Sequence, residues 1–250
     1  MIQLKNKEQI EAMKIAGRIT GEALLKGAEM VREGVTTKQI DNAVRTYIEK
    51  CGARPSFLGY GGFPGSACIS VNNEIIHGIP SDRRFLSEGD IVKIDVGAFY
   101  HGFHGDSANT FAVGNISDEA KSLIDVTRES FYRGIAQIHP EARLGDLGHA
   151  IEAYAQENGF SVVRDFVGHG VGHELHESPD VPNFGTPGRG SRIYNGMTFA
   201  VEPMVNCGTA KVRVLDDEWT VVTADGSLSA HYEHTIAVTE EGILLLTKVD

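Results

Sequence analysis

Apolar residues recur at helical spacing in four segments of the chain, and a helix-start signal precedes three of them. The first helix is expected to begin after Asn6 and to stop by Gly34, and the second to run from Thr36 to Gly52. Asn6 and Thr36 are each followed three residues later by a glutamine, which is the capping-box pattern. Beyond these helices, residues 55–113 predict a series of short strands punctuated by glycine.

The pattern of the first segments returns after residue 114. Ser117 is expected to cap a third helix that His139-Pro140 breaks, and a fourth helix is expected to end at Gly159. Chance similarity between two helix-then-strand segments is the weaker explanation, because the helix ends match as well. At a constant offset of 107 residues the matching positions are Gly27 with Gly134, Ile40 with Leu147, Ala43 with Ala150, Tyr47 with Tyr154, and Gly52 with Gly159.

This repeat predicts the fold class. We expect an α+β protein with a single domain, residues 1–250, whose halves of about 1–114 and 115–250 are related by a pseudo-two-fold axis. The strands are expected to pair into a curved, mostly antiparallel sheet with the helices behind it. Because each half places an acidic residue at the end of an apolar strand, the repeat also predicts a site on that axis.

Composition restricts the class of function. The chain has 23 Lys and Arg against 34 Asp and Glu, a formal net charge of −11, and an acidic protein without a basic cluster binds nucleic acid and anionic membranes poorly. The three cysteines form no CxxC pair, which favours a reducing compartment. No signal-peptide core is seen, and no apolar run reaches about 18 residues. We therefore expect a soluble, cytoplasmic protein with neither a membrane nor a nucleic-acid partner.

Four acidic residues follow or end apolar strands. A carboxylate in such a position costs free energy unless it is paired or binds a cation. Any one of them alone is better explained as a surface acid, but four in similar surroundings favour a shared site. They are Asp95, Asp106, Glu202 and Glu233.

Asp95 and Asp106 belong to one expected hairpin. A turn centred between Tyr100 and His101 would place the two acids directly opposite, with Cβ atoms about 4.5–5.5 Å apart. A turn at His101-Gly102 would place them diagonally, still on one face of the sheet. Either register suits a shared cation, because two adjacent carboxylates do not both ionise cheaply without one.

His169 is the fifth candidate ligand and lies in the glycine-rich segment VGHGVGHELHESP. Taken alone, it would be interpreted as a loop imidazole. Four carboxylates with one imidazole are too hard and too anionic for a structural zinc site, and suit two bridged divalent ions such as Mn²⁺, Co²⁺ or Fe²⁺, with Zn²⁺ also compatible. A two-metal site activates a water and polarises a carbonyl or phosphoryl oxygen. The residues therefore indicate a metal-dependent hydrolase.

At these residues the chain resembles the type I methionine aminopeptidases, which share the pita-bread fold with prolidases and creatinases. The resemblance extends over essentially the whole chain, and its motifs are specific in combination and order. They are GYGGFPGSACISVNNEIIHGIP, IVKIDVGAFYHGFHGDSANTFAVG, GHGVGHELHESP, MTFAVEPMV and HYEHTIAV.

The resemblance implies a role for each ligand. Asp106 and Glu233 would bridge two metal ions, Asp95 would bind one of them, and His169 with Glu202 would complete the other. Glu202 would also serve as the general base and acid of the reaction.

The resemblance implies further residues that contact the substrate. His77 and His176 would hold the peptide and stabilise the tetrahedral intermediate or its leaving amine. Without the resemblance, His77 would be interpreted as a turn histidine and His176 as a surface histidine. The methionine pocket would be formed by residues for which core packing is the alternative. These are Tyr60, Phe63, Cys68, Leu175 and Trp219, with Phe63, Leu175 and the nearby Gly61 standing where some relatives have Tyr, Phe and His.

The implied activity is removal of the initiator methionine from nascent proteins when the second residue is small. The resemblance also implies a transient contact with the ribosome, and we expect a monomer. One alternative is a proline-directed peptidase of the same fold, an enzyme type that usually carries an additional N-terminal domain. The other is a metal-free pita-bread binding module, against which the presence of all five ligands argues.

Overall fold

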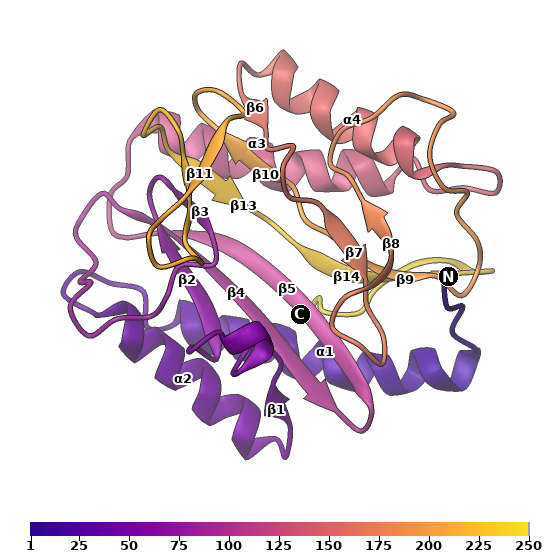
Figure 1. Ribbon diagram of the computed structural model, residues 1–250, viewed down its shortest axis with the longest axis horizontal. Helices are drawn as coiled ribbons and strands as arrows, with labels where there is room; N and C mark the ends of the chain where they lie inside the picture. Colours follow the sequence, from indigo (N-terminus) through magenta and orange to yellow (C-terminus); the bar gives the residue numbers. More distant parts are fainter. Residues whose placement is uncertain (250) are drawn as a thin grey trace.

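The computed structural model describes residues 1–249 and has helices on both sides of a set of antiparallel strands (Figure 1). Two helices come from the first half of the chain and two from the second, as predicted. Their bounds are α1 (Lys7–Ala28), α2 (Thr37–Lys50), α3 (Asp118–Ile135) and α4 (Leu144–Glu157).

The helix starts follow the local signals in the sequence. The Asn6 side chain accepts from the Gln9 backbone while the Gln9 side chain accepts from the Asn6 backbone, both at 2.9 Å, and Thr36 forms the same reciprocal pair. The predicted end of the first helix was too late, because α1 ends at Ala28 rather than near Gly34. The residues that follow α1 leave the helix and pack their side chains against the same core from a loop.

The strands form four sheets, and all pairings within residues 1–249 are antiparallel. One sheet has the order β1-β4-β2 with β5 on β4, and the others have the orders β13-β10-β6, β11-β12-β3 and β15-β14-β9-β7-β8. The prediction of uniformly short strands was wrong, because β4 and β5 are each ten residues long. The bounds are β1 (Arg54–Pro55), β2 (Ala67–Val71), β3 (Glu74–Ile76), β4 (Ile91–Tyr100), β5 (Phe103–Ala112), β6 (Ser161–Val162), β7 (Gly168–Gly170), β8 (Glu177–Val181), β9 (Thr198–Val201), β10 (Met204–Asn206), β11 (Val212–Val214), β12 (Val221–Thr223), β13 (Ser229–His231), β14 (His234–Thr239) and β15 (Gly242–Leu245).

The β4–β5 hairpin turns at His101-Gly102. Both turn residues have positive φ, 46° and 91°, as a two-residue hairpin turn that matches the strand twist requires. Asp106 therefore pairs with Gly97, and Asp95 with Ala108. The directly opposed register was wrong, and the diagonal register is the one the chain adopts.

Helix packing repeats between the two halves of the chain. A Cβ on Gly27 in α1 would lie 2.9 Å from Val44 in α2, and a Cβ on Gly134 in α3 would lie 2.6 Å from Ile151 in α4. Each helix pair thus meets at a glycine that no larger residue could replace without a shift. The assignment of residues 1–250 to one domain with a boundary near 114 stays a prediction.

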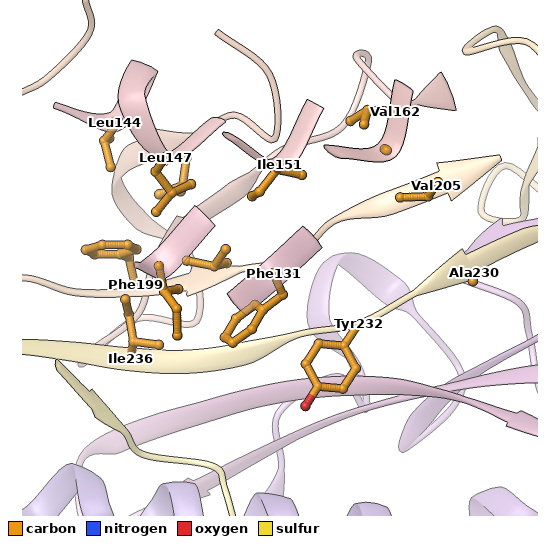
Figure 2. Close-up of a cluster of buried hydrophobic side chains, with 14 of the residues drawn as sticks. Phe131, Leu144, Leu147, Ile151, Val162, Phe199, Val205, Ala230, Tyr232 and Ile236 are labelled. Atoms are coloured by element: carbon orange, nitrogen blue, oxygen red, sulfur yellow. The ribbon is translucent and has the colours of Figure 1, made fainter. Parts of the chain in front are cut away.

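Each helix pair covers its own core. α1 and α2 pack on β4, β5 and β2, while α3 and α4 pack on β13, β10 and β6. Figure 2 shows the second core, where Phe131 of α3 lies between the α4 side chains and two residues of the later strands, Tyr232 in the β13–β14 connection and Ile236 on β14. No helix within residues 1–249 is both long and apolar enough to span a membrane.

The two halves meet at a short seam between β5 and the β13–β14 connection. The backbone N–H of Glu233 donates to the carbonyl of Ala108 at 2.8 Å, and the N–H of Ala108 donates to the carbonyl of Glu233 at 3.3 Å. The Ser107 hydroxyl also donates to the Glu233 carbonyl, at 2.8 Å. These bonds fix an acidic residue of the second half beside the hairpin that carries Asp95 and Asp106.

Candidate metal centre and substrate pocket

All twelve predicted site residues line one cavity of about 490 Å³. Strands from different sheets supply the five candidate ligands. Asp95 lies on β4, Asp106 on β5 and His169 on β7, while Glu202 follows β9 and Glu233 precedes β14.

The ligand side chains are close together and well buried. Nε2 of His169 lies 3.6 Å from Oδ2 of Asp106 and 3.6 Å from Oε1 of Glu202. One ligand atom each from Asp106, His169 and Glu233 lie within 4.8 Å of one another. The side chains of Asp106 and Glu233 are only 5% and 3% exposed.

Several carboxylate oxygens in this cluster are unsatisfied. Oδ1 of Asp95, Oδ1 of Asp106 and Oε1 of Glu233 are buried without a hydrogen-bond partner. Within residues 1–249 no lysine or arginine nitrogen lies within 4.0 Å of these carboxylates, whose near nitrogens belong to histidines. Orphaned, buried carboxylate oxygens in this number match the hard oxygen ligands that a divalent metal ion takes.

Burial dominates the electrostatics of the acids. It raises the pKa of Asp95 to about 7. It also raises the pKa of Asp106, Glu202 and Glu233 well above their ordinary values, and the neighbouring carboxylates raise it further. Without a cation, burial and mutual repulsion favour the protonated forms of these groups. A divalent ion would stabilise their ionised forms.

His169 is oriented by its own backbone neighbour. Its Nδ1 lies 3.0 Å from the carbonyl oxygen of Gly170, which can only accept, so Nδ1 carries the proton and Nε2 presents its lone pair. Nε2 is also the atom that faces Asp106 and Glu202. Burial lowers the pKa of this ring to about 3, so the imidazole is neutral, the state that a metal ligand requires.

His77 and His176 lie on loops at the edge of the same cavity. His77 follows β3 with φ of 59°, a conformation that is sparsely populated for residues with a side chain and that is often found at functional sites. Nδ1 of His176 lies 2.7 Å from the Tyr60 hydroxyl. The His176 ring centroid is 4.0 Å from that of His169. Both candidate substrate histidines are thus beside the acid cluster.

The residues predicted to form an apolar pocket lie together in the same cavity. Phe63, Cys68 and Leu175 form one buried cluster with Trp219 packed against it, the Phe63 and Trp219 rings lying 5.1 Å apart. Tyr60 is 46% exposed and stands at the rim. Gly61 has φ of 56°, and a Cβ there would lie 3.4 Å from Trp219, so a side chain at this position would narrow the pocket beside Trp219.

The sequence interpretation missed several residues that the structure brings to the site. Phe57, Ile76 and Phe166 also line the cavity, and apolar residues of this kind carry no local signal. His231 lies directly behind the cluster, with Nε2 3.8 Å from Oε2 of Glu202. Its spacing of two residues from Glu233 was the one available signal.

Comparison with known proteins agrees with this site. The sequence pattern of metallopeptidase family M24 matches residues 11–240. The chain belongs to metallopeptidase family M24. It is 54% identical to a methionine aminopeptidase of Clostridium perfringens and 49% identical to methionine aminopeptidase 1 of Bacillus subtilis, with all of each chain covered. The crystal structure of methionine aminopeptidase from Thermotoga maritima superposes with a TM-score of 0.98 at 46% identity, with all of both chains covered.

Membership of family M24 confirms the predicted pita-bread fold and makes the chain a metallopeptidase, a hydrolase. The acid cluster and the family together indicate a divalent metal cofactor.

Proposed function

We propose that this chain removes the N-terminal methionine of peptides and nascent proteins when the second residue is small. One observation carries the proposal: the acid cluster and the apolar pocket of Phe63, Cys68 and Leu175 share one cavity. Relatives 49–54% identical over the full chain are named methionine aminopeptidases, which supports it.

The five ligands would hold two divalent metal ions. Asp106 and Glu233 would contact both, Asp95 would complete one, and His169 with Glu202 would complete the other. When bound, the ions supply a water of lowered pKa and polarise the scissile carbonyl. The donor set accepts Co²⁺, Mn²⁺, Fe²⁺ or Zn²⁺, so availability selects among them.

Glu202 is the residue placed to move the proton. Its carboxylate accepts a proton as the water oxygen bonds to the carbonyl carbon, and gives the proton to the leaving amine as the C–N bond breaks. Asn183 donates to the Glu202 backbone carbonyl at 2.9 Å and holds this short connection after β9 in place. Positioned proton transfer of this kind contributes about 10²–10⁴-fold to a rate.

His77 and His176 would act on the substrate rather than on a metal. Burial lowers the pKa of His77 to about 4 and lowers the pKa of His176, so both rings are neutral hydrogen-bonding groups. His176 would donate to the developing oxyanion, and His77 would hold the peptide or its leaving amine.

The pocket would select the first residue of the substrate. An apolar slot lined by aromatic rings and the Cys68 sulfur suits the flexible, polarizable methionine side chain. The ring of Tyr60 would close the outer side of the slot.

The setting of the reaction is part of the proposal. The substrates would be polypeptides with an N-terminal methionine. The protein would act on them in the cytoplasm as they leave the ribosome, as a monomer that contacts the ribosome transiently.

The experiment is a peptidase assay on chelator-treated protein, with and without added Co²⁺ or Mn²⁺. The substrates are Met-Gly-Met-Met, Leu-Gly-Met-Met and an Xaa-Pro dipeptide. Metal-restored cleavage of the methionine peptide alone is expected. Cleavage of only the Xaa-Pro substrate would show a proline-directed peptidase, and no cleavage by metal-loaded protein would show a binding module.

A matched pair of variants tests the histidine role in the same assay. His77→Ala is expected to lower kcat strongly because it removes a group at the reacting centre. His149→Ala, on the exposed face of α4, removes the same side chain far from the cavity and is expected to keep wild-type kcat. Equal activity of the two variants would contradict the role given to His77.

A further inference from the structure

His231 is a buried polar residue with no partner. It ends β13, is 1% exposed, and neither Nδ1 nor Nε2 has a hydrogen-bond partner. Leaving a buried donor or acceptor without a hydrogen-bond partner destabilises the fold. The position of His231 is explained if its ring donates a hydrogen bond to neighbouring groups in the metal-loaded protein.

The ring faces the metal ligands from outside the cavity. Nε2 lies 3.8 Å from Oε2 of Glu202 and 3.9 Å from Oε2 of Glu233, and His231 does not line the cavity. This position is that of a partner of ligands, not of a ligand.

The surroundings determine which nitrogen carries the proton. Nε2 has a carboxylate oxygen of Glu202 and one of Glu233 within 4.0 Å, whereas Nδ1 has no hydrogen-bond partner. Two carboxylates beside Nε2 favour the proton on that atom.

We propose that His231 is a positioning residue whose Nε2–H orients the carboxylates of Glu202 and Glu233 and thereby raises the affinity of the centre for divalent metal. A movement of about 0.6 Å in the Glu202 carboxylate, or about 0.7 Å in that of Glu233, brings its oxygen within hydrogen-bond range of about 3.2 Å. Ligating carboxylates held by such outer hydrogen bonds are the general pattern of metal sites, and loss of an outer partner costs about 10–100-fold in metal affinity or activity. The inference rests on the metal centre assigned under the proposed function.

The test compares two replacements of His231. His231→Leu fills a similar volume without a donor, and His231→Gln keeps an N–H donor. Dissociation constants for Co²⁺ are measured by calorimetric titration of chelator-treated protein, with the Co²⁺ absorption spectrum recorded in parallel. His231→Leu is expected to weaken Co²⁺ binding about 10–100-fold, and His231→Gln to recover most of the affinity with an unchanged spectrum.

His234→Gln is the matched control. His234 is also a buried histidine, but its ring nitrogens are bonded to Thr247 at 2.8 Å and Tyr232 at 3.1 Å, away from the carboxylates. Its replacement is expected to lower the melting temperature without changing the Co²⁺ affinity.

Two results would overturn the proposal. If His231→Leu binds Co²⁺ as tightly as the wild type, His231 only fills the core. If His231→Gln binds as weakly as His231→Leu and its Co²⁺ spectrum shows a changed ligand set, His231 is a direct ligand. Because the titration needs no peptide, failure to cleave methionine substrates would overturn the proposed function and leave this test intact.

Discussion

A buried ion pair connects the N-terminal segment to the loop that carries His176. The ammonium of Lys5 pairs with the carboxylate of Glu177, and the two side chains are 2% and 5% exposed. The Lys5 backbone is itself held by a 2.7 Å bond from its N–H to the carbonyl of Gly196. Glu177 directly follows His176 and also lines the cavity. The Lys5–Glu177 pair therefore fixes one end of the loop that carries His176.

Neutralising one partner leaves the other charge buried without compensation. Breaking a buried pair in this way costs about 3–5 kcal/mol, whereas replacing both partners by apolar groups is often neutral. In a chain of this size each kcal/mol of unfolding free energy corresponds to about 2–4 °C in melting temperature. Lys5→Met is therefore expected to lower the melting temperature by about 6–20 °C, and Lys5→Met/Glu177→Leu to recover much of that loss.

Calorimetry and urea titration of the single and double variants measure the coupling directly. Lys7→Met is the control, because Lys7 is exposed nearby and such substitutions change stability by about 0.5 kcal/mol or less. Peptidase assays at a temperature where all variants are folded then measure how the loop that carries His176 affects turnover. We expect a lower kcat for Glu177→Leu. Single variants that cost less than about 1 kcal/mol, or a double variant equal to the sum of the singles, would refute the reasoning.

Three further predictions concern the site and the core. Glu202→Gln is expected to lower kcat about 10²–10⁴-fold, because the amide accepts no proton, and metal-loaded enzyme with wild-type turnover would contradict this. Chelator-treated protein should be more stable to urea at pH 5 than at pH 8. In the folded protein the pKa of Asp95 is about 7, above its ordinary 3.8. The contribution of this carboxyl group to the free energy of unfolding is therefore fully present below about pH 4 and is lost as the pH rises through 7. Added Mn²⁺ should make the protein more stable to urea at pH 8 than at pH 5. A urea midpoint of the chelator-treated protein that does not change with pH would contradict the role given to the buried acids. Gly134→Val should destabilise by about 1–3 kcal/mol in urea titration, because a Cβ there lies 2.6 Å from Ile151; an unchanged midpoint would show that α3 and α4 can separate.

Local signals in the sequence were sufficient for the helices and for the identity of the candidate ligands. A helix start depends on side chains within three residues of the cap, so Asn6, Thr36 and Ser117 could be recognised without any tertiary contact. The end of α1 could not, because it depends on a core that the loop after Ala28 packs against. The acids were recognisable because carboxylates at the ends of apolar strands are uncommon without a cation.

Tertiary structure alone decided how those groups meet. The hairpin had two compatible registers, and the positive φ of His101 and Gly102 selected the diagonal one. The direction of the His231 ring and the pairing of Lys5 with Glu177, 172 residues apart, are likewise absent from any local pattern. Periodicity and capping report interactions between neighbours in the chain, whereas a buried charge or an orphaned imidazole is defined by what packs around it. The sequence therefore determined the elements and the chemical types of the site, and the packing of the two halves determined their partners.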